Sequence, residues 1–358
     1  MAMNFQQRKD WVDFGKGLLM ILVYVYHSEV IIGSQHSFSW WFAPFFLTGF
    51  FFLSGYLYTS NIRLVNFKEK LKQVFRTILV PYVIFMVFML GPKIMLLDID
   101  AEQQIIDVLM FRASWFVVVI GVLQIIYTCL IRIKADLLFV SLATIILFGL
   151  GYFIQVNYDD YLSFVNNNIY IQSKELPNRF PFCFNICMIM SPFFLLGIIY
   201  RHFETSILIP NSWKFIGGCV VCYIGLMGLD SCFFDSHIVV ATNSYKNLPL
   251  IFIYAFVGIL SLLLISKKVS SIRFVNYIGR YSLLFYYLNA FALRIVRVVL
   301  LKLHIDLEST WSIIIGALIA VALTFPMVMF INRYLPVLSG QKEAFNRISR
   351  ALNLNIQW

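Results

Sequence analysis

Continuous apolar stretches of nearly twenty residues, separated by short polar segments, recur along the whole chain. An α-helix that crosses the hydrocarbon core of a bilayer needs about twenty apolar residues. A membrane β-barrel would instead show segments of about ten residues with alternating polarity. The pattern therefore predicts an all-α, polytopic membrane bundle of about ten transmembrane helices, at residues 14–32, 41–59, 78–97, 114–131, 136–156, 182–200, 214–233, 248–266, 281–300 and 311–331.

The composition also indicates a protein that faces lipid. Apolar residues make up 60% of the 358 positions and charged residues only 13%. Soluble domains are about half apolar and about a quarter charged. So few charges cannot coat a soluble globule of this size. The chain is therefore predicted to be a single membrane domain over residues 1–358, with a cytoplasmic tail at 333–358 and no soluble module.

Basic residues outnumber acidic ones, with 28 Lys and Arg against 18 Asp and Glu. When the spans are threaded with the N-terminus inside, the loop 60–77 and the tail hold many of the basic residues on one side, and most acidic residues fall on the other. This is the positive-inside pattern, so both termini are predicted to be cytoplasmic. Topology thus explains the net charge of +10, and no nucleic-acid partner is expected.

The first predicted span contains ionisable residues, which are costly inside a membrane and are often functional there. Lys16 and His27 are eleven residues apart, so they share one helix face with about 16 Å between them along the axis. Asp13 lies one turn before Lys16 on nearly the same face. An imidazole is well suited to exchange a proton near neutral pH. His27 is therefore expected either to transfer protons or to hydrogen-bond a neighbouring helix.

Other charged residues lie near the predicted outer ends of spans. Glu29 follows His27 by two residues and projects to nearly the opposite side of the helix. It is expected either to line an outer vestibule or to pair with another span. Arg294 and Arg297 are one turn apart, and they either neutralise an anionic group of a substrate or extend to the lipid headgroups.

The longest external segments are predicted at 98–113 and 157–180. Because loops on a rigid scaffold often carry binding sites, each segment is either an acceptor-binding surface or a plain connector. No clear internal repeat is visible, which argues against a transporter built from paired halves.

The six cysteines predict neither a disulfide framework nor a metal site. A single Cys-x-x-Cys pair, Cys219 and Cys222, lacks the second pair that a zinc site of this type requires. Most of the cysteines lie within predicted spans, where they are expected to serve helix packing.

Several short motifs follow one another in a fixed order. The first span carries Asp13-x-x-Lys16-Gly17 and then His27, with ten residues between the cation and the imidazole. The later motifs are Phe50-Phe51-Phe52-Leu53-Ser54-Gly55-Tyr56, Arg76-Thr77-Ile78-Leu79-Val80-Pro81-Tyr82, Ser114-Trp115-Phe116, Gly279-Arg280-Tyr281-Ser282-Leu283 and Tyr286-Tyr287-Leu288-Asn289. This ordered set resembles the membrane acyltransferase-3 family, which O-acylates bacterial surface glycans. The aspartate and lysine resemble its branch of sugar and polysaccharide O-acetyltransferases.

The sequence departs from the pattern of that family at three positions. Lys16 replaces the more usual arginine, and Asn289 stands where the family often has a histidine, so no proton transfer is assigned to Asn289. The loop before Arg76 lacks a second arginine, because Gln73 lies three residues earlier. Lys70 or Lys72 would have to substitute, and lysine binds phosphate without the bidentate fork of arginine.

The resemblance implies an O-acyltransferase of the bacterial cytoplasmic membrane. The expected donor is acyl-CoA, and in particular acetyl-CoA, as a substrate with no bound cofactor. The expected acceptor is a hydroxyl of a cell-surface or lipid-linked glycan. His27 is expected to act as general base or to carry the acyl group. Suspected donor-side residues are Lys16, Arg76, Ser54 and Asp13, and acceptor-side candidates are Glu29, Trp115, Asn289, Arg294 and Arg297.

Three alternatives stay open at this point. Ser54 either hydrogen-bonds a substrate or serves as a small packing residue beside Gly55. A lipid-linked glycan transporter or other multi-pass carrier would use the same buried polar groups without acyl transfer, and it would move its substrate unmodified. The third alternative is that the chain is a non-catalytic partner in a glycan-assembly complex.

Overall fold

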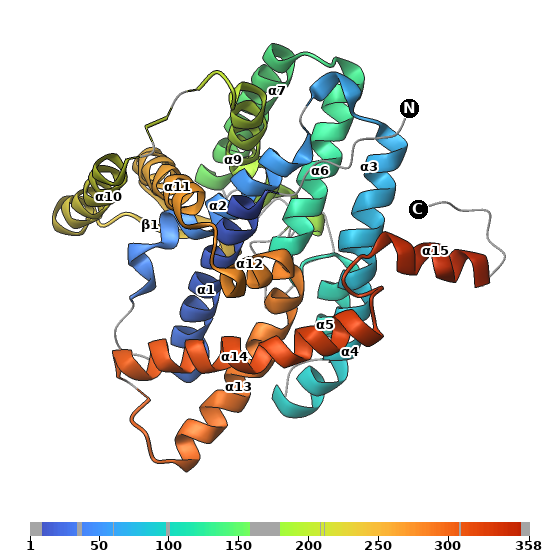
Figure 1. Cartoon of the computed structure of the whole chain (residues 1–358), viewed down its shortest axis with the longest axis vertical. Coiled ribbons are helices and arrows are strands. Elements are labelled where there is room, and N and C mark those ends of the chain that lie inside the picture. The colour runs from blue at the N-terminus through green and yellow to red at the C-terminus, as the bar shows by residue number, and fades with distance from the viewer. Residues whose placement is uncertain are drawn as a thin grey trace. The chain divides into compact units, whose positions relative to one another are not determined.

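The computed structural model describes residues 9–33, 38–59, 61–97, 101–157, 180–207, 209–210, 212–307 and 309–351, and for 92–97 the backbone alone. Most of this chain is helical (Figure 1). Its first part contains α1 Asp10–Ile32, η1 Ser39–Trp41, α2 Ala43–Tyr58, η2 Ile62–Leu64, α3 Phe67–Val74, η3 Phe75–Leu79, α4 Val80–Leu97, α5 Ala101–Leu109, α6 Trp115–Ile133 and α7 Leu137–Val156.

The second part begins with η4 Pro181–Cys183, α9 Phe184–Phe203 and α10 Trp213–Phe233. A two-stranded sheet then pairs β1 His237–Val239 with β2 Ser244–Lys246, with η5 Val240–Thr242 between the strands. The remaining helices are α11 Leu248–Val269, α12 Arg273–Arg280, α13 Ser282–Lys302, α14 Thr310–Tyr334 and α15 Lys342–Ala351.

Within the described residues, nine helices are long and apolar enough to cross a membrane, and α2 is a shorter apolar helix of 16 residues. Together they correspond to the ten predicted spans. The prediction of an all-α polytopic membrane protein is confirmed. That both termini are cytoplasmic stays a prediction.

One predicted span has a longer helix than the apolar pattern indicated. The pattern placed its start at residue 78, whereas a continuous helical stretch begins at Phe67 and runs through α3, η3 and α4. The added part carries Lys68, Glu69, Lys70, Lys72 and Arg76. Hydropathy therefore registers only the apolar part of the helix.

Polar side chains cap the N-termini of several helices. The side chain of Asn66 accepts a hydrogen bond from the backbone N–H of Glu69 at the start of α3. Asp136 and Ser212 do the same at the starts of α7 and α10. Such caps satisfy N–H groups that have no partner within the helix. Polar residues thus set where these helices begin after the preceding loops.

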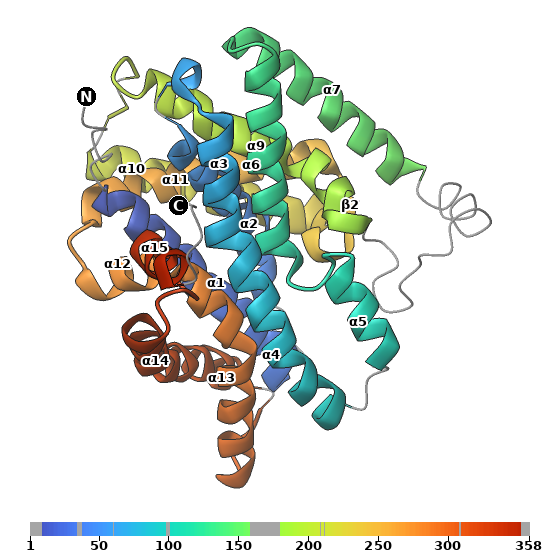
Figure 2. The same cartoon turned by 90° about the vertical axis from the view of Figure 1, so that its right-hand side faces the viewer.

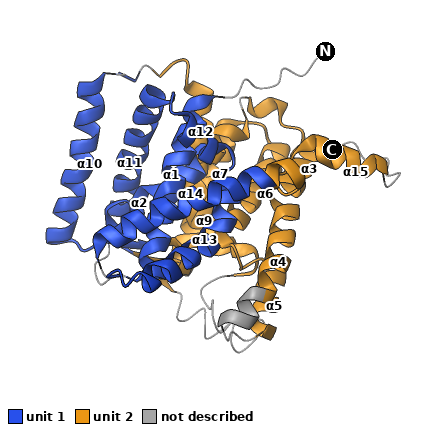
Figure 3. Ribbon diagram, turned by 60° about the horizontal axis from the view of Figure 1, so that its bottom comes forward, with its two compact units in different colours: residues 1–53, 208–238, 246–330 blue, residues 54–207, 239–245, 331–358 orange. Residues whose placement is uncertain are grey.

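The chain divides into two compact units (Figure 3). Unit 1 comprises residues 1–53, 208–238 and 246–330, and unit 2 comprises 54–207, 239–245 and 331–358. Unit 1 holds α1, the first part of α2 and most of α10 to α14. Unit 2 holds α3 to α9 and α15. The single domain predicted from the sequence stays a prediction.

Helix α1 is the centre of unit 1 and packs against α11, α12 and α13 (Figure 2). Leu19 and Tyr24 are fully buried on it. The hydroxyl of Tyr24 donates to the backbone oxygen of Phe285 on α13 at 3.0 Å and to Oγ1 of Thr324 on α14 at 2.9 Å. Polar contacts between helices are retained in membranes because the surrounding lipid offers no alternative partner. Tyr24 therefore joins three helices of the unit.

Unit 2 is built on the packing of α6, α7 and α9. The hydroxyl of Tyr127 on α6 contacts Oγ1 of Thr144 on α7 at 2.9 Å and donates to the backbone oxygen of Ser191 on α9 at 2.9 Å. The outer faces of the helices are apolar, as on α7, where Ile145 is 64% exposed and Phe153 is 66% exposed. Exposed apolar side chains of this density fit a surface that faces lipid.

Candidate active site on the first membrane helix

Helices α1 and α12 meet through their backbones, beside Lys16. A Cβ atom at Gly17 would collide with the backbone oxygen of Val275, and one at Gly279 would collide with that of Asp13. Two residues without side chains therefore allow the two helices to approach closely. Gly17 follows Lys16 directly, so this crossing determines where the lysine leaves α1.

Helix α12 is held on its other side by aromatic contacts to α14. The ring of Phe274 stacks on Phe325 with centroids 5.2 Å apart, and Tyr277 lies 4.5 Å from the same ring. Arg280, the last residue of α12, is exposed and lies over the ring of Tyr281 at 6.0 Å. The short helix is thus fixed between α1 and α14.

The helix face that joins Lys16 to His27 is turned into the protein. Met20 and Val23 lie on this face between them, and they are only 1% and 2% exposed. Asp13, Lys16 and His27 are each half-buried. The predicted pairing of a cation and an imidazole on one helix face therefore lies along the packed side of α1, not along a lipid-facing side.

Hydrogen bonds to two other helices fix the rotation of α1 near His27. Tyr24 binds α13 and α14 as described above. Ser28, which is fully buried, donates to the backbone oxygen of Ile313 on α14 at 2.9 Å. The ring of His27 lies edge-on to Tyr26, with centroids 5.4 Å apart. Because its neighbours along the chain are anchored, the backbone of His27 has a fixed position in unit 1.

Glu29 engages the chain that follows α1. Its Oε1 accepts hydrogen bonds from the backbone N–H groups of Phe38 at 2.6 Å and Ser39 at 2.8 Å. Sequence reasoning considered an outer vestibule or a contact with another span, and it missed this bond to the entrance of η1. A direct contact of Glu29 with an acceptor stays a prediction.

The remaining unit 1 candidates all lie on α13. Asn289 is buried, with 3% exposure. Arg294 and Arg297 are both exposed on the same helix. Helix α13 packs against α1, so it belongs to the same helix cluster as Lys16 and His27. The roles predicted for these three residues stay predictions.

Ser54 belongs to unit 2, where the two residues that follow it, Gly55 and Tyr56, pack against α9 and its end. A Cβ atom at Gly55 would collide with the backbone oxygen of Phe194 on α9. The hydroxyl of Tyr56 donates to Oε2 of Glu204 at 2.7 Å and accepts from Nη1 of Arg201 at 2.7 Å. The Ser-Gly-Tyr motif therefore joins α2 to α9, and Ser54 itself is half-buried.

Arg76 lies on η3, a single turn of π-helix, and is half-buried. Such turns occur frequently at functional sites. Nζ of Lys70 donates to the backbone oxygen of Tyr58 and lies over its ring at 4.4 Å. Nζ of Lys72 lies 3.6 Å from Oε1 of Glu69. Both lysines named as substitutes for a second arginine thus have protein partners.

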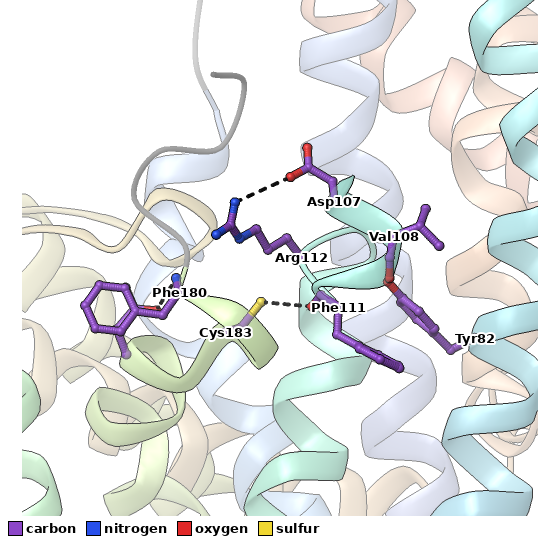
Figure 4. A network of polar contacts seen from close by, with 8 residues as sticks. Tyr82, Asp107, Val108, Phe111, Arg112, Phe180 and Cys183 are labelled. Carbon is purple, nitrogen blue, oxygen red and sulfur yellow. Dashed lines mark hydrogen bonds and ion pairs between the residues drawn. The ribbon is translucent and has the colours of Figure 1, made fainter. Parts of the chain in front are cut away.

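Trp115 begins α6 and is half-buried. The chain just before this helix contains a buried charged pair that sequence reasoning missed (Figure 4). Nη1 of Arg112 lies 3.8 Å from Oδ1 of Asp107, and their side chains are only 4% and 2% exposed. The ring of Phe111 stacks between Tyr82 at 4.9 Å and Phe182 at 5.1 Å. Apart from Tyr82, which ends the motif that begins at Arg76, no periodicity or family motif marks these residues.

Phe111 and Phe182 both have positive φ angles, 56° and 59°. Such a backbone conformation is costly for a residue with a bulky side chain. The backbone N–H of Phe182 donates to the oxygen of Met110 at 2.9 Å, and Sγ of Cys183 lies 3.4 Å from the oxygen of Phe111. Stacked rings and hydrogen bonds thus hold the entrance of α6 in a fixed conformation.

The family model described as an acyltransferase domain, that of the acyltransferase-3 family, matches residues 9–330. The chain belongs to the acyltransferase-3 family. The resemblance that the ordered motifs indicated is confirmed, and the chain is a multi-pass membrane acyltransferase. No curated protein and no solved structure matches it significantly.

The acyltransferase continues beyond the matched range into a segment that packs within unit 2. Gly340 has a φ of 69°, and a Cβ atom there would lie 2.9 Å from Cα of Thr77 and 3.3 Å from the backbone oxygen of Arg76. Helix α15 follows and buries Ala344 and Phe345. The C-terminal segment of the acyltransferase therefore contacts the turn that carries Arg76.

One predicted part of the site is the external loop that precedes η4. Most of the external loop 157–180 lies outside the described residues, so its predicted acceptor role is untested. Among the described residues, no three His, Cys, Asp or Glu side chains come together as a metal ion would require. The acyltransferase thus has the candidate catalytic residue His27 in unit 1, with candidate binding residues on α1 and α13, and it has Ser54, Arg76 and Trp115 in unit 2.

Proposed function

We propose that the chain transfers an acetyl or other short acyl group from cytoplasmic acyl-CoA to a hydroxyl of a cell-surface or lipid-linked glycan. The observation that supports this most is the inward-turned face of α1, with Lys16 near one end and His27 near the other. Family membership supplies the reaction class. The helix geometry supports the proposal because it has a lysine and a histidine on one face of the same helix.

The donor half of the proposal concerns Lys16. CoA carries several phosphates and a long, thin arm that ends in the thioester. A lysine ammonium is a serviceable phosphate partner, although it binds as a point charge. With the phosphates at Lys16, an extended arm points along α1 towards His27, which is about 16 Å away along the axis. Arg76 is a second donor-side candidate, and its substitution is to be tested separately, through the KM for acetyl-CoA.

The acceptor half concerns His27 as general base. Its neutral ring nitrogen removes the proton of the glycan hydroxyl while the hydroxyl oxygen bonds to the thioester carbonyl carbon. The carbon–sulfur bond then breaks, and the proton passes from the imidazolium to the CoA thiolate. In the alternative route, the ring nitrogen bonds to the acyl carbon first, the carbon–sulfur bond breaks, and the N–H proton of the ring passes to the CoA thiolate. In a second step the glycan hydroxyl oxygen bonds to the acyl carbon, the carbon–nitrogen bond breaks, and the hydroxyl proton returns to the imidazole.

The experiment compares wild type with His27→Ala and His27→Gln for transfer of labelled acetyl from acetyl-CoA to membrane glycan. The control is His202→Ala, because His202 is exposed in unit 2. We expect both His27 variants to lose activity by roughly 100- to 10,000-fold, with unchanged membrane insertion, and the control to behave as wild type. Normal transfer by inserted His27→Ala protein would exclude the catalytic role.

Two further measurements separate direct transfer from the acyl-histidine route, and acyl transfer from a carrier function. Label that stays on the protein without acceptor, and is lost in His27→Gln, indicates the acyl-histidine route. A carrier would move glycan across the membrane without modifying it and without acetyl-CoA. Transport that continues at the wild-type rate in the absence of acetyl-CoA, with no acyl group on the product, would therefore contradict the proposed function.

A further inference from the structure

The short segment Phe38–Trp41 is held at two points near the end of α1 that carries His27. Glu29 accepts from the backbone N–H groups of Phe38 and Ser39. At the other end of the segment, the hydroxyl of Tyr223 on α10 donates to the backbone oxygen of Trp41 at 2.8 Å. All of these residues belong to unit 1. The segment is therefore anchored to the helix of the candidate base and to α10.

A row of aromatic rings connects this segment to His27. Centroid distances are 6.3 Å from Phe38 to Phe42, 5.4 Å from Phe42 to Phe46 and 5.6 Å from Phe46 to Tyr26. The ring of Tyr26 then lies 5.4 Å from the imidazole of His27. Phe38 is 44% exposed, whereas Phe42 and Phe46 are buried. The row thus runs from an exposed ring to the candidate base.

Two adjacent tryptophans form the half-exposed part of the segment. The rings of Trp40 and Trp41 lie 4.4 Å apart at an angle of 32°. Both pack against a buried cluster that includes Tyr223 and Tyr254. Phe45 supports the cluster, with its ring edge-on to Tyr223 at 5.2 Å. One part of each indole ring therefore packs against this cluster, and the rest of its surface stays exposed.

The chemistry of these rings matches a sugar. One face of a pyranose ring presents C–H groups with partial positive charge, which stack on the electron-rich face of an aromatic ring. Tryptophan provides the largest such face, and its indole N–H can donate to a hydroxyl. His27 is five residues from the end of α1, which is about 7.5 Å along the axis. A sugar stacked beside this end can reach the imidazole with a hydroxyl.

We propose that Phe38, Trp40 and Trp41 form the binding platform for one pyranose residue of the acceptor glycan, and that Glu29 is the residue that positions it. This proposal rests on the proposed acyl transfer at His27. Glu29 acts here through the backbone of the platform, because its Oε1 accepts from the N–H groups of Phe38 and Ser39. The alternative for the tryptophans is anchoring at the membrane interface, where tryptophan is enriched.

The first test substitutes Trp40→Ala and Trp41→Ala, with Trp311→Ala as the matched control. Trp311 is 71% exposed near the start of α14 in the same unit, at the end predicted to face outward. The assay titrates membrane vesicles that contain the cell's own glycan against the acyltransferase, with labelled acetyl-CoA. We expect each platform variant to raise the half-saturating amount of glycan about three- to tenfold, with the KM for acetyl-CoA unchanged.

The control should keep wild-type values for both substrates. If Trp40→Ala and Trp41→Ala only lower the amount of inserted protein, and leave the kinetic constants per inserted molecule unchanged, the tryptophans are interface anchors and the platform is excluded. If His27→Ala retains transfer, the proposed function fails. If His27→Ala is inactive but both tryptophan variants have normal glycan saturation, only the platform fails.

The second test concerns the positioning role of Glu29. Glu29→Leu removes the acceptor for both backbone N–H groups, so it should raise the half-saturating amount of glycan as the tryptophan variants do. Glu29→Gln keeps a side-chain oxygen at the same place and should restore most of the binding. Equal defects in the two variants would show that the carboxylate charge itself is needed, and this would overturn the positioning role.

Discussion

At the scale of single residues, Lys16 supplies the sharpest test of the donor side. A phosphate contact formed equally in the bound substrate and in the transition state changes KM and leaves kcat unaltered. Hydrogen bonds to charged groups contribute about 1.5–3 kcal/mol. We therefore expect Lys16→Gln to raise the KM for acetyl-CoA by roughly ten- to hundredfold, as measured by steady-state transfer kinetics.

Two matched variants complete this experiment. Lys16→Arg keeps the positive charge and should stay within a few-fold of wild type. Lys302→Gln removes an exposed cation at the end of α13 and should have no effect. A KM for acetyl-CoA that is the same in Lys16→Gln and wild type would remove Lys16 from the donor site.

The buried pair of Asp107 and Arg112 leads to a prediction on stability. Removal of one member takes the counter-ion of this pair away from a buried charge, which costs about 3–5 kcal/mol, whereas replacement of both members of a pair by apolar residues is often neutral. Arg112→Met and Asp107→Leu should each lower the thermal midpoint of the detergent-solubilised protein. The double variant should recover much of the loss. Additive losses in the double variant would contradict a coupled pair.

At the scale of elements, the crossing of α1 and α12 depends on glycine. A Cβ atom at Gly279 would meet the backbone of Asp13 and the amide nitrogen of Gly17, the latter at 2.7 Å. Backbone atoms cannot rotate away as a flexible side chain can, so Gly279→Ala must push the helices apart. We expect reduced insertion and thermal stability, together with a loss of acyl transfer that exceeds the loss of protein.

Gly228→Ala on α10 is the matched control, because a Cβ atom there has no neighbour within 4 Å among the described residues. It should be neutral or slightly stabilising, since alanine has the higher helix propensity. If Gly279→Ala has the same effect as Gly228→Ala, the crossing does not determine the position of Lys16.

At the scale of the whole molecule, topology can be tested with cysteines that the chain already has. Cys232 is exposed near the predicted outer end of α10, and Cys129 is exposed near the predicted cytoplasmic end of α6. A membrane-impermeant maleimide applied to intact cells should label a variant that keeps only Cys232, and it should label the Cys129-only variant only after lysis. The reverse pattern would invert the predicted orientation.

The spans were predictable because hydropathy reports the solvent that surrounds each segment. The spacing of Lys16 and His27 was predictable because a helix has a fixed period. The helical start at Phe67 was missed because its first residues are amphipathic, and hydropathy does not distinguish such a helix from a polar loop.

Contacts between distant segments could not be obtained in this way. The bond from Glu29 to Phe38 depends on how the chain leaves α1, and the pair of Asp107 and Arg112 depends on a turn with Phe111 at positive φ. Neither is encoded by a periodic pattern. Gly17 and Gly279 were visible within the motifs, but only the packed helices show that they face each other.

The crossing of α1 and α12 has a consequence for how this protein can change. Its contact is made by main-chain atoms, so no nearby side chain can be exchanged to compensate for a larger residue at Gly279. Second-site suppressors of such a change should therefore be rare around it. Side chains that line the rest of the bundle can be replaced without moving the crossing of α1 and α12. A new acyl donor or sugar could thus be accommodated while the lysine that precedes Gly17 keeps its place.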